Sequence, residues 1–285
     1  MSKILVAHSP DADDIFMYYA IYFGWVNSKN IKFENIALDI ESLNQAALES
    51  KYLISAISFG AYPFIKNDYA LLNTAVSFGN GYGPKLIKKK NRVLKKNFKV
   101  ALSGALTTNA MIFKMRYKDA RIIYKNFLDI ENSILSGEVD AGVLIHESIL
   151  NFDKNLEVEA NLWDIWLELI KEELPLPLGG MVLCRSIPLL RAIECQKLLT
   201  KSVSLAVNNK KVLIPMLKNF VRINEKDLHT YLDMYANKDS ISLNEKQIKA
   251  IDALLKIGFN NGIYKNLIKV DDCLIPTEYE GLRFS

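Results

Sequence analysis

The sequence predicts an α/β protein built as two lobes, and three features of the chain support this prediction. Residues 3–77 alternate between strand-like and helix-like patterns, and residues 98–175 repeat that alternation. A basic stretch at residues 85–99 separates the two blocks. The chain has 285 residues, of which 50% are hydrophobic, so two domains can each bury a core.

The first block opens with a strand at residues 3–8, an acidic turn at 9–14 and an apolar helix from residue 15. Serine, proline and aspartate are typical of helix N-termini, where the helix dipole also favours the carboxylates of the turn. These aspartates therefore have a structural explanation and need not be catalytic. The other elements predicted in this block are strands at 32–40, 53–58 and 69–77 and a helix at 42–50.

Two turns of the first block have features of ligand sites. Ser58 ends the third strand and Gly60 follows it, and such a turn can present backbone N–H groups to an anion or a hydroxyl. The alternative is an ordinary tight turn between strand and helix. Residues 79–84 contain Gly-x-Gly-x-Gly but open no predicted helix, so we reject a dinucleotide-binding motif.

The basic stretch at residues 85–99 is interpreted as a solvated hairpin. No aromatic residue interleaves with its lysines and arginine before Phe98, so a stacking surface for nucleic acid is poorly supported. The net charge of +4 is also too small to argue for a nucleic-acid partner. The change in composition predicts that the chain crosses between the lobes at residues 93–97.

The second block begins with a strand at residues 98–103. Thr107, Thr108 and Asn109 then stand at the start of a helix predicted at 110–117. These side chains can cap the helix, or they can bind a carboxylate through hydroxyl and N–H groups. A short strand at 120–124 completes this unit.

The most informative segment of the chain ends at His146. A helix is predicted at residues 129–137, and the apolar run at 141–145 reads as a buried parallel strand. His146 follows at the carboxyl end of that strand, where open α/β sheets bind ligands. An imidazole at this place is a candidate general base. The alternative is a histidine that caps the strand by bonding a nearby carbonyl.

Side-chain alternation gives an expectation for the neighbouring glutamate. His146 and Leu144 share one face of the strand, whereas Ile145 and Glu147 point to the other. If His146 faces a cleft, Glu147 does not, unless the backbone turns between them. Glu147 is therefore expected to cap or support rather than to transfer protons.

The rest of the chain is predicted to return to the first lobe. Residues 162–170 are amphipathic, residues 174–180 are rich in proline and glycine and break any helix, and residues 181–184 form a strand. Helices are predicted at 188–207, 210–221, 225–236 and 244–258. Lobe 1 is therefore predicted to comprise residues 1–92 and 182–285 and lobe 2 residues 98–175, with crossings at 93–97 and 176–181.

Composition limits the classes of protein and of site. Cys184, Cys195 and Cys273 are far apart and form no CxxC pair, and His8, His146 and His229 lack metal-ligand spacing. No apolar run approaches the roughly 20 residues of a membrane span, and no export signal is visible. We therefore expect a cytoplasmic protein with no metal site and no membrane partner. Its oligomeric state is left open.

Several short motifs follow one another along the chain. They are Ser9-Pro10 with Asp14, Ser42-Leu43-Asn44, Ser58 with Ala61-Tyr62, Gly81 with Gly83-Pro84, Thr107-Thr108, Ile145-His146-Glu147-Ser148, Leu174-Pro175-Leu176-Pro177-Leu178-Gly179 and His229-Thr230-Tyr231. The ordered set spans nearly the whole chain. It resembles the 1,4-dihydroxy-6-naphthoate synthases of the futalosine pathway of menaquinone biosynthesis.

This resemblance implies a fold like the type II periplasmic binding proteins, with a small-molecule substrate held between the lobes. It also implies a lyase that converts cyclic dehypoxanthinylfutalosine to 1,4-dihydroxy-6-naphthoate and releases a three-carbon fragment, dihydroxyacetone. One imidazole in a closed, dry cleft can perform such a step without a metal or an organic cofactor. His146 is by analogy the base. The expected substrate-binding residues are Asp14, Ala56, Ile57, Ser58, Thr107 and Thr108.

The chain departs from the family pattern in two places. The family's first loop can read Ser-Pro-Cys-Pro-Asn-Asp, whereas residues 9–14 here read Ser-Pro-Asp-Ala-Asp-Asp. Ala56 stands where a lysine is sometimes found, so a side-chain contact from that lysine would be lost here.

Several alternatives remain open. One is chorismate dehydratase, which has the same fold and serves the same pathway, although the His146-Glu147 end of the strand argues against it. Another is a non-catalytic small-molecule-binding protein of this fold. If His146 is not the base, Asp14 or His8 is the next candidate.

Overall fold

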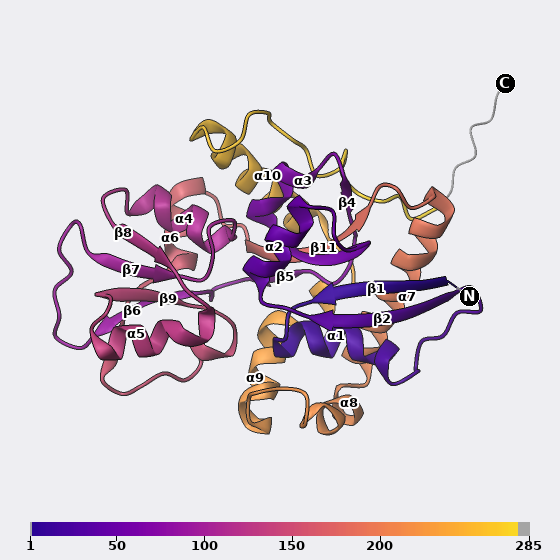
Figure 1. The fold of residues 1–285 in the computed structure, drawn as a ribbon, viewed down its shortest axis with the longest axis horizontal. Coiled ribbons are helices and arrows are strands. Elements are labelled where there is room, and N and C mark those ends of the chain that lie inside the picture. Colours follow the sequence, from indigo (N-terminus) through magenta and orange to yellow (C-terminus); the bar gives the residue numbers. More distant parts are fainter. Residues whose placement is uncertain (1, 279–285) are drawn as a thin grey trace.

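The structure is a computed structural model that describes residues 2–278, and it confirms an α/β fold with two lobes (Figure 1). Each lobe is built around its own sheet, of six strands in the first and five in the second. The second sheet and its helices form the magenta part at the left of Figure 1.

The first sheet contains both N-terminal strands and a strand from the middle of the chain. Its strands are β1 (Ser2–His8), β2 (Ile31–Ala37), β3 (Ile54–Ser58), β4 (Tyr69–Leu71), β5 (Ser77–Gly79) and β11 (Leu176–Cys184). The order is β2-β1-β3-β11-β4, and β5 also pairs with β11. Because β1 is parallel to β2 and β3, the carboxyl ends of these strands meet at one edge.

The second sheet carries the predicted histidine segment. Its strands are β6 (Lys85–Lys89), β7 (Lys99–Leu102), β8 (Arg121–Tyr124), β9 (Ala141–Leu144) and β10 (Leu156–Asn161). The order is β10-β6-β9-β7-β8, with β9 parallel to β7 and antiparallel to β6. The expected buried parallel strand before His146 is therefore confirmed.

The prediction of a solvated hairpin at residues 85–99 is wrong for its first part. β6 is an inner strand of the second sheet, and its residues Leu86 and Ile87 are fully buried. Two apolar residues suffice because Lys88, which follows them, is neutralised by glutamates of the edge strand. Lys88 forms ion pairs with Glu157 and Glu159 of β10.

The strands that belong to each sheet indicate where the chain passes from one lobe to the other. β6 already belongs to the second sheet, and β11 pairs with β3, β4 and β5 of the first sheet from residue 176 onward. We therefore propose crossings at residues 80–84 and 171–175, in place of those expected at 93–97 and 176–181. Residues 279–285, which were assigned to lobe 1, lie outside the described part of the chain.

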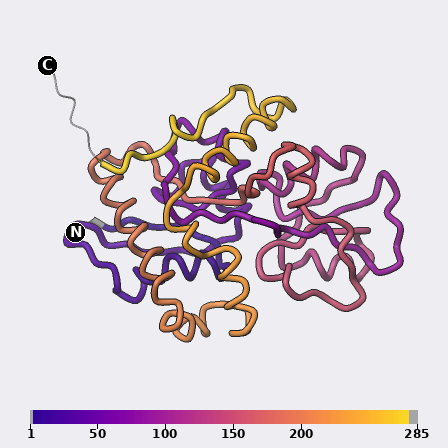
Figure 2. The backbone as a smooth tube through the Cα atoms, turned by 180° about the vertical axis from the view of Figure 1, so that it is seen from behind, coloured from indigo at the N-terminus to yellow at the C-terminus, as the bar shows by residue number. Residues whose placement is uncertain are grey.

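Helices cover both sheets and complete the two cores. The first lobe carries α1 (Ala12–Tyr22), α2 (Ile40–Leu48), α3 (Tyr62–Ile65), α7 (Leu189–Asn208), α8 (Lys210–Leu217), α9 (Glu225–Tyr235) and α10 (Glu245–Asn260), and the second carries α4 (Thr108–Arg116), α5 (Ile130–Ser136) and α6 (Leu162–Ile170). Figure 2 shows the orange C-terminal helices lying against the indigo N-terminal segment, where α7 packs on α1. Within residues 2–278, every helix is too short or too polar to cross a membrane.

Candidate active site

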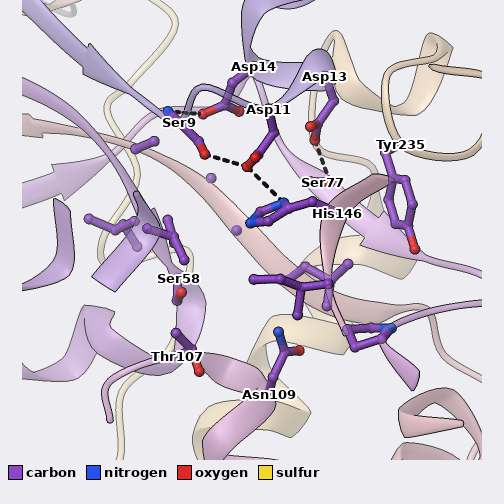
Figure 3. Close-up of a pocket in the computed structure, with 18 of the residues that line it drawn as sticks. Ser9, Asp11, Asp13, Asp14, Ser58, Ser77, Thr107, Asn109, His146 and Tyr235 are labelled. Carbon is purple, nitrogen blue, oxygen red and sulfur yellow. Dashed lines mark hydrogen bonds and ion pairs between the residues drawn. The ribbon is translucent and has the colours of Figure 1, made fainter. Parts of the chain in front are cut away.

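A cavity lies where loops of the two lobes meet, and side chains of both lobes line it (Figure 3). Of the predicted site residues, the cavity is lined by Asp14, Ala56, Ile57, Ser58, Thr107 and His146, and Thr108 lies outside the lining.

His146 reaches the cavity through a turn of the backbone. β9 ends at Leu144, and a 3₁₀ turn spans His146–Ile149. The φ of His146 is +56°, a left-handed conformation that is uncommon for a residue with a side chain. Strand alternation therefore stops at His146, and Glu147 reaches a different partner. Its Oε1 accepts a hydrogen bond of 2.9 Å from the N–H of Ala12, in the first turn of α1.

The imidazole of His146 is paired with a carboxylate from the other lobe. His146 Nδ1 lies 2.7 Å from Oδ2 of Asp11, a residue that is only 2% exposed and follows β1 (Figure 3). The ring of Phe127 meets the imidazole edge to face, with 4.9 Å between the centroids. His146 Nε2 is buried and has no hydrogen-bond partner among the described residues. With a proton on Nδ1, Nε2 offers its lone pair to a ligand.

The surrounding carboxylates make this imidazole unusually basic. Burial lowers the pKa of His146, but the charge and hydrogen bond of Asp11, with the charges of Glu147 and Asp13, outweigh burial and raise the pKa to about 9. The imidazolium that forms when His146 accepts a proton is thus stabilised by the same groups.

Two further carboxylates of the first loop line the cavity. Asp13 accepts hydrogen bonds from the Ser77 hydroxyl at 3.2 Å and the Tyr231 hydroxyl at 3.1 Å. Burial, and then the charge of Asp11, raises the pKa of Asp13 to about 6. Asp14 accepts a bond of 2.7 Å from the N–H of Ser9, and burial followed by the charge of Asp13 raises its pKa well above the usual value.

Glu147 shares this electrostatic environment although it does not line the cavity. Burial, and then the charge of Asp11, raises its pKa to about 7. Its bond to Ala12 fits the expectation that it caps or supports. No lysine or arginine occurs among the lining residues, all of which belong to the described part of the chain. The fixed charges at the cavity are therefore carboxylates and one imidazole.

The opposite wall of the cavity offers hydroxyl groups. The N–H of Ser58 donates to Asn44 Oδ1 at 2.9 Å, and Asn44 Nδ2 donates to Ser58 Oγ at 3.2 Å. The Ser58 oxygen thus accepts a hydrogen bond from Asn44, and the proton of the Ser58 hydroxyl is left to be donated to a ligand. Ala56 and Ile57 precede Ser58 on β3 and line the wall with apolar atoms.

The two threonines at the start of α4 have structural partners. Thr107 caps the helix, since its hydroxyl accepts from the N–H of Ala110 at 3.1 Å and donates to the Gly104 carbonyl at 3.1 Å. The Thr108 hydroxyl accepts from the N–H of Gly60 at 3.0 Å and donates to the Leu178 carbonyl at 3.1 Å. Thr108 therefore joins the two lobes beside the cavity.

Three functional candidates lie outside the predicted site residues, although the sequence offers Asn109, with Thr107 and Thr108, as a side chain able to bind a carboxylate. Asp11 was one of several aspartates in a turn, and nothing in the pattern distinguished it from Asp14. Asn109 lines the cavity with a buried Oδ1 that has no partner among the described residues, yet its type and position fit a helix start equally well. Tyr231 reaches the cavity from α9, far along the chain.

His8 takes no part in the cavity wall. Its Nδ1 lies 2.6 Å from the Ser9 carbonyl oxygen, its Nε2 lies 3.0 Å from Asn35 Nδ2, and burial lowers its pKa. The ring also stacks on Tyr18. These contacts give His8 a structural role.

The sequence is similar to that of known proteins over most of its length. A family model described as menaquinone biosynthesis matches residues 4–260. A relative from Thermus thermophilus, named 1,4-dihydroxy-6-naphtoate synthase, is 25% identical over 257 residues, which cover 89% of this chain and 93% of the relative. A Streptomyces coelicolor protein of the same name is 24% identical over 258 residues, covering 88% and 90%.

Similarity to solved structures identifies the fold. A crystal structure of a protein from Archaeoglobus fulgidus matches with a TM-score of 0.85 and 32% identity, covering 92% of this chain and 98% of that one. The alkanesulfonate-binding protein SsuA of Xanthomonas axonopodis pv. citri, bound to MOPS, matches with a TM-score of 0.69 and 11% identity, covering 96% and 98%. A Candida albicans protein described as having the generic periplasmic binding protein fold matches with a TM-score of 0.68 and 10% identity, covering 99% of each chain. The expected periplasmic-binding-protein-like architecture is thereby confirmed.

Proposed function

This chain belongs to the menaquinone biosynthesis family, and from that premise we propose that it is a carbon–carbon lyase, a 1,4-dihydroxy-6-naphthoate synthase. Its substrate would be cyclic dehypoxanthinylfutalosine, and its products 1,4-dihydroxy-6-naphthoate and dihydroxyacetone. The names of the two relatives support the identity of the naphthoate product.

The observation that carries this proposal is the state of His146. Asp11 occupies Nδ1, while the buried Nε2 has no protein partner among the described residues, so the neutral ring, which prevails above its raised pKa, can accept a proton from a ligand in the cavity. Breaking a carbon–carbon bond beside a newly forming aromatic ring needs such a proton removal, and aromatisation supplies the driving force. In this proposal Asp11 orients the ring and stabilises the imidazolium.

The charge of the cavity supports this substrate over chorismate. Chorismate carries two carboxylates, whereas the cavity offers carboxylates of its own and no lysine or arginine among its described lining residues. A dianion would lose hydration there without gaining a cationic partner other than His146. The cyclic futalosine derivative carries one carboxylate and several hydroxyls. The wall at Ser58 is the part of the cavity best able to receive the carboxylate, because the Ser58 hydroxyl can donate a hydrogen bond to it and lies opposite the acidic loop (Figure 3).

Mass spectrometry of purified protein mixed with each substrate tests the proposal. We expect 1,4-dihydroxy-6-naphthoate to form from the cyclic futalosine derivative, and chorismate to remain unchanged. His146→Asn is the matched control for a contaminating activity. Conversion of chorismate would establish the dehydratase instead, and tight binding of the futalosine derivative without turnover would identify a non-catalytic binding protein.

A further inference from the structure

Asp11 and His146 meet although they belong to different lobes. Asp11 follows β1 of the first sheet, and His146 follows β9 of the second, yet Asp11 Oδ2 and His146 Nδ1 are 2.7 Å apart. The next residue of each loop makes a second contact of the same kind, between the N–H of Ala12 and Glu147 Oε1 at 2.9 Å. The general base and its partner are thus supplied by opposite sides of the cleft.

We propose that Asp11 is a positioning residue that completes the general base from the opposite lobe, and that its pairing with His146 strengthens as the lobes close on substrate. The inference rests on the proposed function for the identity of the reaction and of the ligand. The pairing itself rests on the geometry.

The two sides of the interface between the lobes differ in how tightly they are packed, and this difference permits such a movement. On the α4 side, the Thr108 hydroxyl bonds both Gly60 and Leu178, and the buried Tyr264 hydroxyl donates to the Gly60 carbonyl at 2.8 Å while touching Met111 of α4. This side is packed and suits a hinge.

The His146 side is joined by polar contacts. Besides the two pairs between the loops, Asn151 Nδ2 donates to Asp227 Oδ2 at 2.7 Å in a solvent-exposed position, and the Arg222 guanidinium lies 5.5 Å from the centre of the Phe127 ring. Exposed polar contacts of this kind contribute little stability, so they can open and re-form readily.

Asp11 is itself held in place within the first lobe. The Ser9 hydroxyl donates to the same Oδ2 that faces His146, which fixes the direction of the carboxylate. In the neutral ring, the form that can accept a proton, this oxygen would on closure select the tautomer with the proton on Nδ1 and would turn Nε2 toward the substrate. When the lobes part, the imidazole loses that partner and both tautomers become accessible.

Closure also changes the charges around the imidazole. The first lobe brings Asp11, Asp13 and Asp14 toward it, and Tyr231 lies behind Asp13. From its own lobe His146 is faced by Glu147 and by the Phe127 ring, with Arg222 beyond that ring. The approaching groups are mainly carboxylates, so closing should favour the imidazolium and should be accompanied by proton uptake.

The first test measures the protonation of His146 in solution without ligand. The chain has three histidines, so the imidazole nitrogen signals of His146 can be assigned by their loss in His146→Asn. Since Asp11 contacts His146 in the described arrangement, the pairing should be populated, though not complete, before product binds, and we expect the parent to titrate at least one pH unit above Asp11→Asn, which keeps the shape of the side chain but not its charge. Equal titration of the two proteins would overturn the positioning role. Ser9→Ala serves as a second variant should Asp11→Asn fail to fold, with a smaller shift in the same direction.

The second test measures closure with the product, 1,4-dihydroxy-6-naphthoate, under anaerobic conditions. Calorimetry at about pH 8, between the ordinary imidazole value of about 6.5 and the raised one, is repeated in buffers of different ionisation enthalpy. We expect net proton uptake in the parent, most of it lost in Asp11→Asn and unchanged in Asn151→Ala, which breaks a contact across the cleft away from the base.

The outcomes separate the two proposals. Binding without proton uptake, or with equal uptake in Asp11→Asn, would overturn the closure. Absence of product binding would count against the proposed function instead, and the titration without ligand would still decide the role of Asp11.

Discussion

The hydroxyl of Tyr231, on α9, donates a hydrogen bond to the carboxylate of Asp13, at the start of α1, with 3.1 Å between Tyr231 Oη and Asp13 Oδ1. This hydrogen bond connects one of the C-terminal helices to the first turn of α1, beside the candidate site. Because Asp13 is largely buried, this bond stabilises a carboxylate that has little contact with solvent.

Tyr231→Phe should therefore destabilise the protein in a pH-dependent way. A hydrogen bond to a charged group is worth about 1.5–3 kcal/mol. The pKa of Asp13 is about 6, so the loss should be larger at about pH 8, where Asp13 is ionised, than at about pH 5, where it is protonated. Denaturant unfolding at both values measures the difference. Tyr235→Phe removes a neighbouring hydroxyl that makes no bond to Asp13 and should show no such pH dependence.

His146→Asn should abolish most of the turnover while leaving binding intact. A positioned base contributes roughly 10²–10⁴-fold, and asparagine cannot accept a proton near neutral pH. Asparagine also tolerates the left-handed backbone of this position, so the fold should survive. Steady-state kinetics and product binding check both parts. Glu147→Gln, which affects a helix-capping contact, should lose much less, and a His146→Asn enzyme close to the parental rate would remove His146 from the base role.

Activity should rise with pH over an unusually alkaline range. The pKa of His146 is about 9 in the closed arrangement, and the imidazolium below that value has no lone pair on Nε2. We therefore expect kcat to increase about tenfold per pH unit and to level off near pH 9. Initial rates at saturating substrate measure this. A plateau already reached near pH 7 would contradict it.

Asn109→Ala should weaken substrate binding without weakening the fold. The buried Oδ1 of Asn109 has no partner among the described residues, so no bond within the protein is lost. If substrate provides the missing partner, KM should rise about tenfold, which corresponds to about 1.4 kcal/mol. Thermal unfolding should be unchanged or slightly improved. Thr107→Ala makes the matched contrast, since it removes a helix cap worth about 1 kcal/mol.

Thr108→Val tests whether this threonine binds substrate or joins the lobes. Its hydroxyl bonds Gly60 and Leu178, and valine would leave both backbone groups unsatisfied. We expect a loss of about 1–3 kcal/mol in unfolding free energy with a smaller change in KM. A large rise in KM with unchanged stability would restore the direct binding role that the sequence suggested.

The fold and the position of His146 at the end of a buried strand were accessible from the sequence because they depend on local patterns. The apolar run before His146 is long enough to identify a buried strand, and a strand end is a defined place in an α/β sheet. β6 was missed because only Leu86 and Ile87 mark it among lysines, and the glutamates that neutralise Lys88 are far along the chain. The single strand expected at 69–77 is in fact divided into β4 and β5, with Ala75 in a left-handed conformation between them.

The details of the candidate site depend on contacts between distant segments, and these leave no periodic signal. Asp11 differs from Asp14 only by what lies opposite it, which is His146 of the other lobe. The positive φ of His146 is also unmarked, since neither glycine nor asparagine stands there. Sequence could therefore indicate which loops form the site but not which carboxylate serves the base.

The route of the chain through the two sheets sets the order in which they can be completed during synthesis. The second sheet has all its strands once Asn161 has been made, whereas the first lacks its inner strand β11 until Cys184. Until then β3 presents an unpaired edge, and such edges promote association with other chains. The second sheet can thus be completed while the first, although its strands begin earlier in the chain, still lacks an inner strand. During that interval the exposed edge of β3 is the part of the nascent chain open to pairing with another chain.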